Sequence, residues 1–100
     1  MAFRALLAVS ALSFAAPVLA GDIERACLGA ERSSASRTLC GCIQDAADLT
    51  LSTQDQRRAA AFFRDPHQAQ VVRQSDRRSD ERFWDRYKQF GETAESFCQR

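Results

Sequence analysis

The fold is decided by the stretch Ser79–Cys98, which reads SDERFWDRYKQFGETAESFC. Its apolar residues recur at intervals of four, three, four and three positions, at Phe83, Tyr87, Phe90, Ala94 and Phe97. This spacing places them on one face of an α-helix, which has 3.6 residues per turn. The start at Ser79 is followed by two acidic residues, which favour the positive end of the helix dipole. The stretch therefore predicts a long amphipathic helix, in which Gly91 either allows close packing or marks a break.

The aromatic residues of this helix have two interpretations. One is a hydrophobic core made of Phe83, Tyr87, Phe90 and Phe97, with Trp84 on the flank. The other is the lining of an apolar ligand pocket. Only five phenylalanines follow residue 20, and they supply nearly all the large apolar volume of that part of the chain. The core interpretation is therefore favoured, because a stripe at helical spacing is typically buried.

Upstream of this helix, the same periodicity predicts three or four shorter helices and no strand. The first covers about residues 22–31 with Asp22 as its N-cap, and it buries Ile23, Ala26, Cys27 and Ala30. A serine-rich loop follows at about 32–36 and offers caps for the next helix. That second helix covers about residues 37–49, and its buried stripe is Leu39, Ile43, Ala46, Ala47 and Thr50.

Two further helix starts precede the C-terminal stretch. Ser52 with Asp55 three residues later is a loose capping box, and it introduces a third helix that carries residues 59–63. Asp65 followed by Pro66 is a typical N-cap and first helical residue. We expect a short fourth helix there, with Ala69 and Val72 directed inward. The predicted fold is all-α, a small domain of four to five helices.

Residues 1–20 have the three parts of a secretory signal peptide. Arg4 is the only charge in the first 21 residues, and an apolar run follows from position 5 to position 16. Val18 and Ala20 then provide the small residues that signal peptidase requires, so cleavage is expected between Ala20 and Gly21. A membrane anchor is the rival interpretation. It is disfavoured because a spanning helix needs about 20 apolar residues, and this run is shorter and ends at Pro17.

Cleavage would leave residues 21–100, which form one small domain. These residues include 13 basic and 13 acidic side chains, so their net charge is zero. A balanced charge argues against partners such as nucleic acid and against general attraction to anionic membranes. Between Arg73 and Lys88 opposite charges recur three or four positions apart, with Arg73 three residues before Asp76 and Arg77 four before Glu81. This pattern is typical of a solvated helix face.

The exported domain has four cysteines: Cys27, Cys40, Cys42 and Cys98. An even number in an oxidising compartment predicts two disulfides. Cys40 and Cys42 are separated by about 200° around a helix, so they would not bond to each other. One of the two should bond Cys27 and the other Cys98, and both arrangements stay open. We prefer Cys27–Cys42 with Cys40–Cys98, because the latter bond would close a loop across most of the domain.

A functional interpretation of Cys40-Gly41-Cys42 is a thiol-redox or metal-handling site. A structural role is favoured, because a zinc site needs spacings such as C-x₂-C, and no methionine follows residue 20. His67 is the only histidine and no nucleophile motif accompanies it, so a surface or capping role is expected. No G-x-S-x-G, P-loop or H-E-x-x-H motif is present. We therefore expect no catalytic, cofactor or metal residues and a non-enzymatic binding or interaction protein.

Several motifs of the chain resemble a known group of proteins. The motifs are LCGCIQ at 39–44, FFRDPHQAQ at 62–70, the aromatic pattern from Phe83 to Gly91, and Phe97-Cys98. This combination is similar to short exported proteins of alphaproteobacteria that are often labelled "arginine transporter". The resemblance implies a periplasmic location and a transport-associated accessory protein, since transport itself requires membrane-spanning elements. The expected partner is an unknown protein or a small solute.

Overall fold

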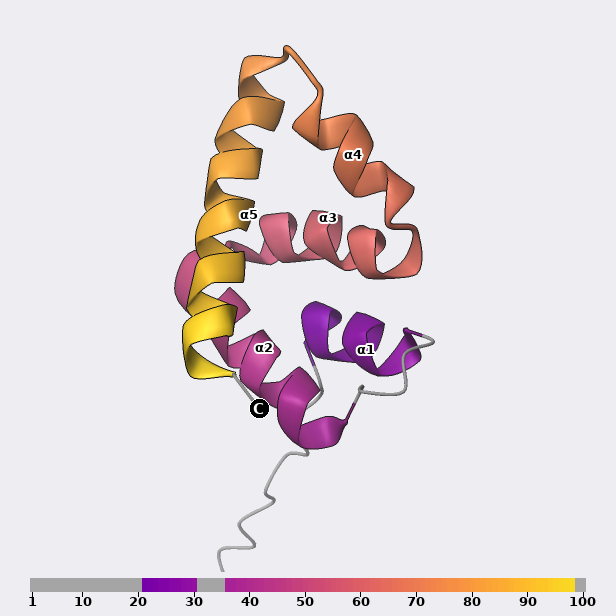
Figure 1. Ribbon diagram of the computed structural model, residues 1–100, viewed down its shortest axis with the longest axis vertical. Helices are drawn as coiled ribbons and strands as arrows, with labels where there is room; N and C mark the ends of the chain where they lie inside the picture. Colours follow the sequence, from indigo (N-terminus) through magenta and orange to yellow (C-terminus); the bar gives the residue numbers. More distant parts are fainter. Residues whose placement is uncertain (1–20, 31–35, 99–100) are drawn as a thin grey trace, which may run out of the picture.

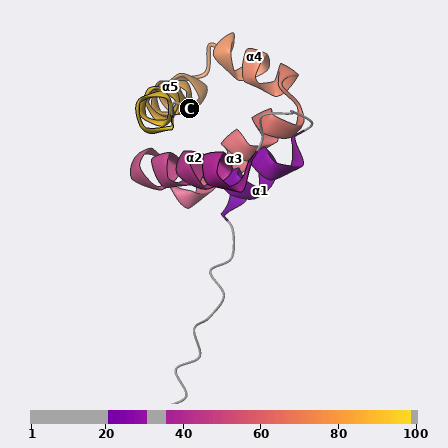
Figure 2. The ribbon, with the colours of Figure 1, turned by 60° about the horizontal axis from the view of Figure 1, so that its bottom comes forward.

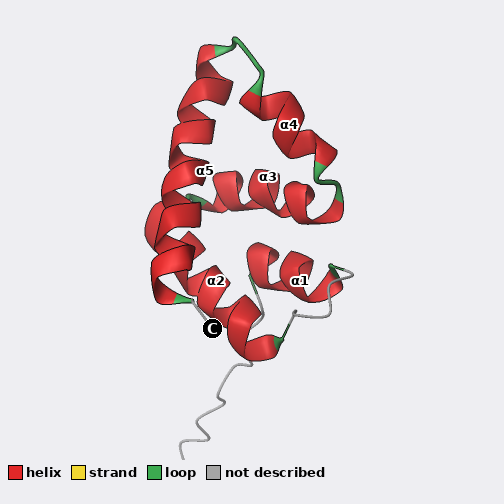
Figure 3. Cartoon of the chain, in the orientation of Figure 1, coloured by secondary structure: helices red, strands yellow, loops and turns green. Residues whose placement is uncertain are grey.

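A computed structural model describes residues 21–30 and 36–98. Within these ranges the chain forms five helices and no strand, which confirms the all-α prediction (Figures 1 and 3). The helices are α1 (Asp22–Gly29), α2 (Arg37–Thr50), α3 (Thr53–Arg64), α4 (His67–Arg73) and α5 (Arg78–Phe97). The predicted signal peptide at 1–20 and most of the 32–36 loop lie outside the described residues. None of the five helices is long and apolar enough to cross a membrane.

The helices are arranged in two groups. In Figure 2, α1, α2 and α3 form one layer, and α4 and α5 form a second layer above it. The buried core contains alanines and three large residues from the first group, and larger residues alone from the second. Its members are Ile23, Ala26, Ala46, Ala47, Leu51, Ala59, Ala60, Phe62, Val72, Phe83 and Phe90. The alanines allow α1, α2 and α3 to approach closely, and the aromatic rings fill the wider space beside α5.

Two of the predicted helix starts are confirmed by their hydrogen bonds. The hydroxyl of Ser36 accepts from the Leu39 N–H at 3.1 Å, and that of Ser52 accepts from the Asp55 N–H at 3.1 Å. Both are side-chain N-caps, which satisfy backbone donors that the first helical turn leaves free. Asp65 also accepts from the His67 N–H at 3.2 Å, in front of α4.

Two other predicted caps are wrong. The residue before α1 is Gly21, and Asp22 already belongs to the helix. The residue before α5 is Arg77 instead of Ser79, and it makes no side-chain cap. At α1 a tertiary contact replaces the local cap. The carboxylate of Asp80, in the first turn of α5, binds Ser75 at 2.6 Å and the guanidinium of Arg58 on α3.

The N-terminus of α1 is capped by a side chain from α2. Gln44 is buried, and its Oε1 accepts from the Glu24 N–H at 2.9 Å. Its Nε2 donates to Gln56 Oε1 at 2.7 Å and to Asp48 at 2.9 Å, so one amide joins α1, α2 and α3. A Cβ at Gly21 would lie 2.4 Å from the Gln44 side chain. Any larger residue at this position would therefore require the capping amide to shift.

The aromatic stripe of α5 forms core, with one exception. Phe83 and Phe90 are buried. Phe97 was expected in the core, but it is 72% exposed and lies outside it. Phe97 lies in the last turn of α5, where the helix passes the end of the core. Gly91 neither breaks the helix nor allows close packing, because α5 continues through it and no atom would contact a Cβ there.

The charged stretch after Arg73 is mostly exposed, as its pattern predicted. Within it Lys88 and Asp85, three residues apart, form an ion pair at 3.6 Å. Two other ion pairs connect α3 to α5, Arg58–Asp80 and Arg86–Asp55. Arg86 forms two hydrogen bonds with Asp55, at 2.6 and 3.1 Å. These pairs hold α5 against α3 from the outside of the core.

Candidate functional site

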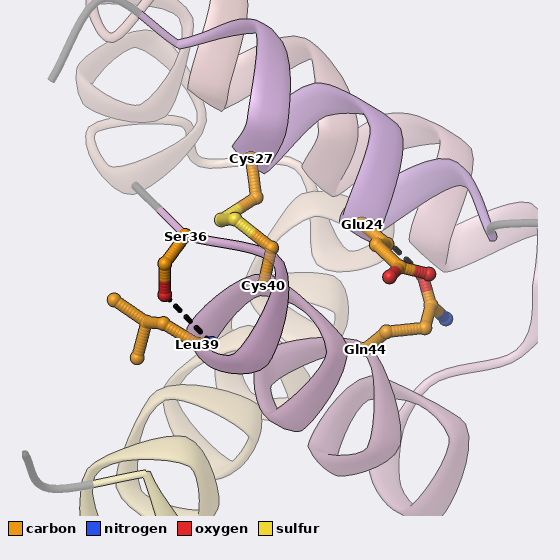
Figure 4. Close-up of a disulfide and its surroundings, with 6 residues drawn as sticks. All are labelled: Glu24, Cys27, Ser36, Leu39, Cys40 and Gln44. Atoms are coloured by element: carbon orange, nitrogen blue, oxygen red, sulfur yellow. Dashed lines mark hydrogen bonds between the residues drawn. A yellow bond between two sulfur atoms is a disulfide. The ribbon is translucent and has the colours of Figure 1, made fainter. Parts of the chain in front are cut away.

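The four cysteines form two disulfides, Cys27–Cys40 and Cys42–Cys98. The prediction of two bonds that join C-x-C to two other segments is confirmed. The preferred pairing, Cys27–Cys42 with Cys40–Cys98, is wrong. Figure 4 shows the side chains of Cys27 and Cys40 meeting between α1 and α2, beside the Gln44 cap.

The pairing follows from the side of α2 on which α1 lies. Cys40 is fully buried and shares its flank of α2 with Gln44, one turn later, whose amide caps α1. Cys42 lies on the opposite flank, where the end of α5 brings Cys98 within a Cα–Cα distance of 5.8 Å. The sequence located the two flanks of α2 correctly. It carried no signal for which flank faces α1, since that depends on long-range packing.

These bonds leave no vicinal dithiol at Cys40 and Cys42. Each sulfur is bonded to a cysteine in another part of the chain, and all four cysteines are paired. Among the described residues, no group of three or more histidine, cysteine or acidic side chains is arranged to hold a metal ion. The cysteine arrangement is that of two structural crosslinks.

A pocket of about 350 Å³ lies between the two groups of helices. Each of the five helices or its cap contributes to the wall, so the pocket exists only in the complete domain. The described residues that line it are Cys27, Ala30, Leu39, Ile43, Phe62, Phe63, Pro66, Ala69, Gln70 and Tyr87. This volume falls at the lower end of the range of about 300–1,000 Å³ that small-molecule sites occupy.

The wall of the pocket is largely apolar and aromatic. Phe62 and Phe63 contribute two rings from α3, and Tyr87 contributes a third from α5. The Phe62 and Tyr87 rings meet edge to face, with centroids 5.0 Å apart. One part of the wall is the buried Cys27 of the Cys27–Cys40 disulfide. None of the described lining residues carries a charge at neutral pH.

Two of the described lining residues, Tyr87 and Gln70, carry polar side-chain groups. Tyr87 is half-buried, and burial raises the pKa of its phenol, so the hydroxyl stays neutral at physiological pH. No residue of the described part of the chain forms a hydrogen bond with this hydroxyl. A neutral phenol both donates and accepts hydrogen bonds. Tyr87 therefore brings to the lining of the pocket a hydroxyl that no described residue binds.

The sequence identified some lining residues but not the pocket. Tyr87 was named as a possible pocket residue, and Cys27, Leu39 and Ile43 were expected on buried faces. Pro66 and Ala69 were expected only as a helix start and a core residue. His67 is exposed and does not line the pocket. The gap between helices that creates the pocket depends on how α4 folds back, for which the sequence has no local signal.

Comparisons with known proteins identify no family for this chain. No protein-family model, no curated protein and no solved structure matches the chain. The functional argument therefore rests on the geometry of the described residues.

Proposed function

We propose that this chain is an exported, non-enzymatic binding protein whose site is the pocket between the two groups of helices. The observation that carries the proposal is the pocket itself, about 350 Å³ with an apolar wall drawn from every helix. Small domains pack their interiors to high density, and spaces larger than a water molecule are few. A space of this size, lined by aromatic rings and one unused hydroxyl, has the composition of a ligand site.

Export is supported by the crosslinks and by the sequence of residues 1–20. Two disulfides in a short chain are typical of an oxidising compartment such as the bacterial periplasm. Gly21, expected to be the first residue after cleavage, also leaves room for the end of the Gln44 side chain that caps α1. The same position thus satisfies the peptidase and the packing of α1.

The pocket favours an apolar ligand over arginine. A guanidinium placed in an apolar wall needs a carboxylate partner, because burying an unpaired charge is costly. The described lining residues include no acidic side chain. The proposed ligand is therefore uncharged, and a transport-associated role with arginine receives no support from this pocket.

Binding of a neutral fluorescent probe tests the proposal. Prodan, a neutral naphthalene with short substituents whose emission rises and shifts to shorter wavelength in apolar surroundings, is titrated into the oxidised protein that begins at Gly21. Saturable enhancement with the wild type is expected. Ala69→Phe fills the pocket from α4 and should abolish the enhancement, whereas Val71→Phe, on the exposed side of α4, should not. Equal enhancement in both variants, or none in the wild type, would overturn the proposal.

A further inference from the structure

We infer that the ligand of this pocket is a neutral aromatic molecule of one or two rings with a single hydroxyl group, which the Tyr87 hydroxyl recognises. This inference rests on the proposed function and names the class of ligand. Three features of the described wall lead to it: its aromatic rings, its volume, and the placement of one unpaired polar group among apolar side chains.

The ring content of the wall favours an aromatic ligand. Phe62 and Tyr87 already pack edge to face, and Phe63 adds another ring to the same wall. Aromatic rings prefer offset or edge-to-face partners at centroid distances of about 4.5–7 Å. The Cys27 sulfur lies in the same wall, and sulfur also contacts aromatic rings favourably. A flat ligand would meet several such partners at once.

The volume limits the size of the ligand. An apolar protein cavity of about 150 Å³ accommodates benzene. The present pocket, at about 350 Å³, is slightly more than twice as large. It therefore suits one ring with a short substituent or two fused rings.

The Tyr87 hydroxyl gives the ligand its polar group. This hydroxyl has no hydrogen-bond partner among the described residues, although its ring is packed against Phe62, Phe83, Trp84 and Phe90. The packing fixes the ring, so the hydroxyl is held in place before a ligand arrives. A ligand hydroxyl would donate to or accept from it, whereas a charged group would meet no opposite charge in the described wall. Gln70 is the second polar lining residue, and it is exposed.

A matched pair of probes tests this assignment. We would measure the affinities of 2-naphthol and naphthalene for the wild type and for Tyr87→Phe by calorimetry. The substitution removes only the hydroxyl, so it should weaken 2-naphthol binding about five- to tenfold, the net value of one hydrogen bond, and leave naphthalene within about twofold. Ala69→Phe should abolish binding of both probes, and Leu49→Ala, at a residue 74% exposed on α2, should change neither.

The outcomes separate this inference from the proposed function. If Ala69→Phe blocks both probes but Tyr87→Phe weakens neither selectively, the pocket is a binding site and the hydroxyl assignment is wrong. If neither probe binds the wild type, both proposals fail. If arginine binds the wild type and Ala69→Phe abolishes this binding, the inference that the ligand is neutral is overturned. Circular dichroism and the thermal midpoint of each variant confirm that it is folded.

Discussion

Replacing Cys42 and Cys98 with alanine is expected to lower the free energy of unfolding by about 4 kcal/mol. A crosslink stabilises a fold mainly by restricting the unfolded chain, and the effect grows with the logarithm of the loop length. This bond joins residues 56 apart, whereas Cys27–Cys40 joins residues 13 apart. The chain-entropy relation gives about 4.2 kcal/mol for the long loop and about 2.9 kcal/mol for the short one at 25 °C.

The comparison of the two bonds needs a second readout. Cys27 and Cys40 are 6% and 0% exposed, so replacing them also removes buried packing and adds to the loss of stability. The slope of the unfolding free energy against urea concentration does not report that packing, because it follows the surface area exposed on unfolding. Removing the long loop lets the unfolded chain expand more, so C42A/C98A should increase the slope more than C27A/C40A. A loss below about 1 kcal/mol with an unchanged slope would refute the chain-entropy argument.

The pairing itself requires variants instead of peptide mapping. Trypsin leaves Cys40 and Cys42 in the same peptide, residues 38–57, because no arginine or lysine separates them. With the observed pairing, C27A/C40A keeps an intact Cys42–Cys98 bond and shows no alkylatable thiol. C27A/C42A removes one partner from each bond and should show two thiols. The opposite pattern of alkylation, read by intact mass, would establish the pairing that the sequence first suggested.

Four further changes test the packing and electrostatics. Phe83→Ala removes a ring that is 1% exposed and should cost about 3–5 kcal/mol in urea unfolding, whereas Phe97→Ala, at 72% exposure, should cost less than about 0.5 kcal/mol. Gln44→Leu leaves the Glu24 N–H without its partner and should cost about 1–3 kcal/mol, measured in the same way. Gly91→Ala should stabilise by about 0.5–1 kcal/mol, because nothing obstructs a Cβ inside this helix; a loss of stability would contradict it. Hydrogen bonds from Ser75 and Arg58 lower the pKa of Asp80 below its ordinary value of 3.8. The stability that the Asp80 carboxylate contributes is therefore complete above pH 3.8, and it is lost as the pH falls through the lower pKa of the folded state. The urea midpoint of Asp80→Asn should therefore fall less steeply below pH 4 than that of the wild type.

The sequence predicted the parts of the fold that depend on neighbouring residues. The spacing of apolar residues from Phe83 to Ala94 gave α5, and the serines at 36 and 52 marked helix starts correctly. These features are local, because a helix face and its cap are fixed within a few residues. The number of disulfides followed from composition alone.

The errors occurred where distant segments replace local partners. The cap of α1 comes from Gln44, a residue that reads in the sequence as an ordinary polar position of α2. The expected cap Ser79 already lies inside α5, which begins at Arg78 without a side-chain cap, and Asp80 in the same turn binds Arg58 on α3. The pocket combines residues from all five helices, and no single segment contains a pattern that predicts it.

The two disulfides supply stability that the unfilled pocket removes. A pocket of about 350 Å³ leaves the side chains of its wall without the packing partners that a filled core would give them. The whole stability of a small domain is only about 5–15 kcal/mol, so lost packing must be offset elsewhere. The two disulfides together restrict the unfolded chain by about 7 kcal/mol on the chain-entropy relation, which is of the same order as that total. A chain of this length without crosslinks would have to fill the space between Ala69 and Tyr87 with side chains. Held by its two bonds, this chain can leave the pocket unfilled, as the proposed binding function requires.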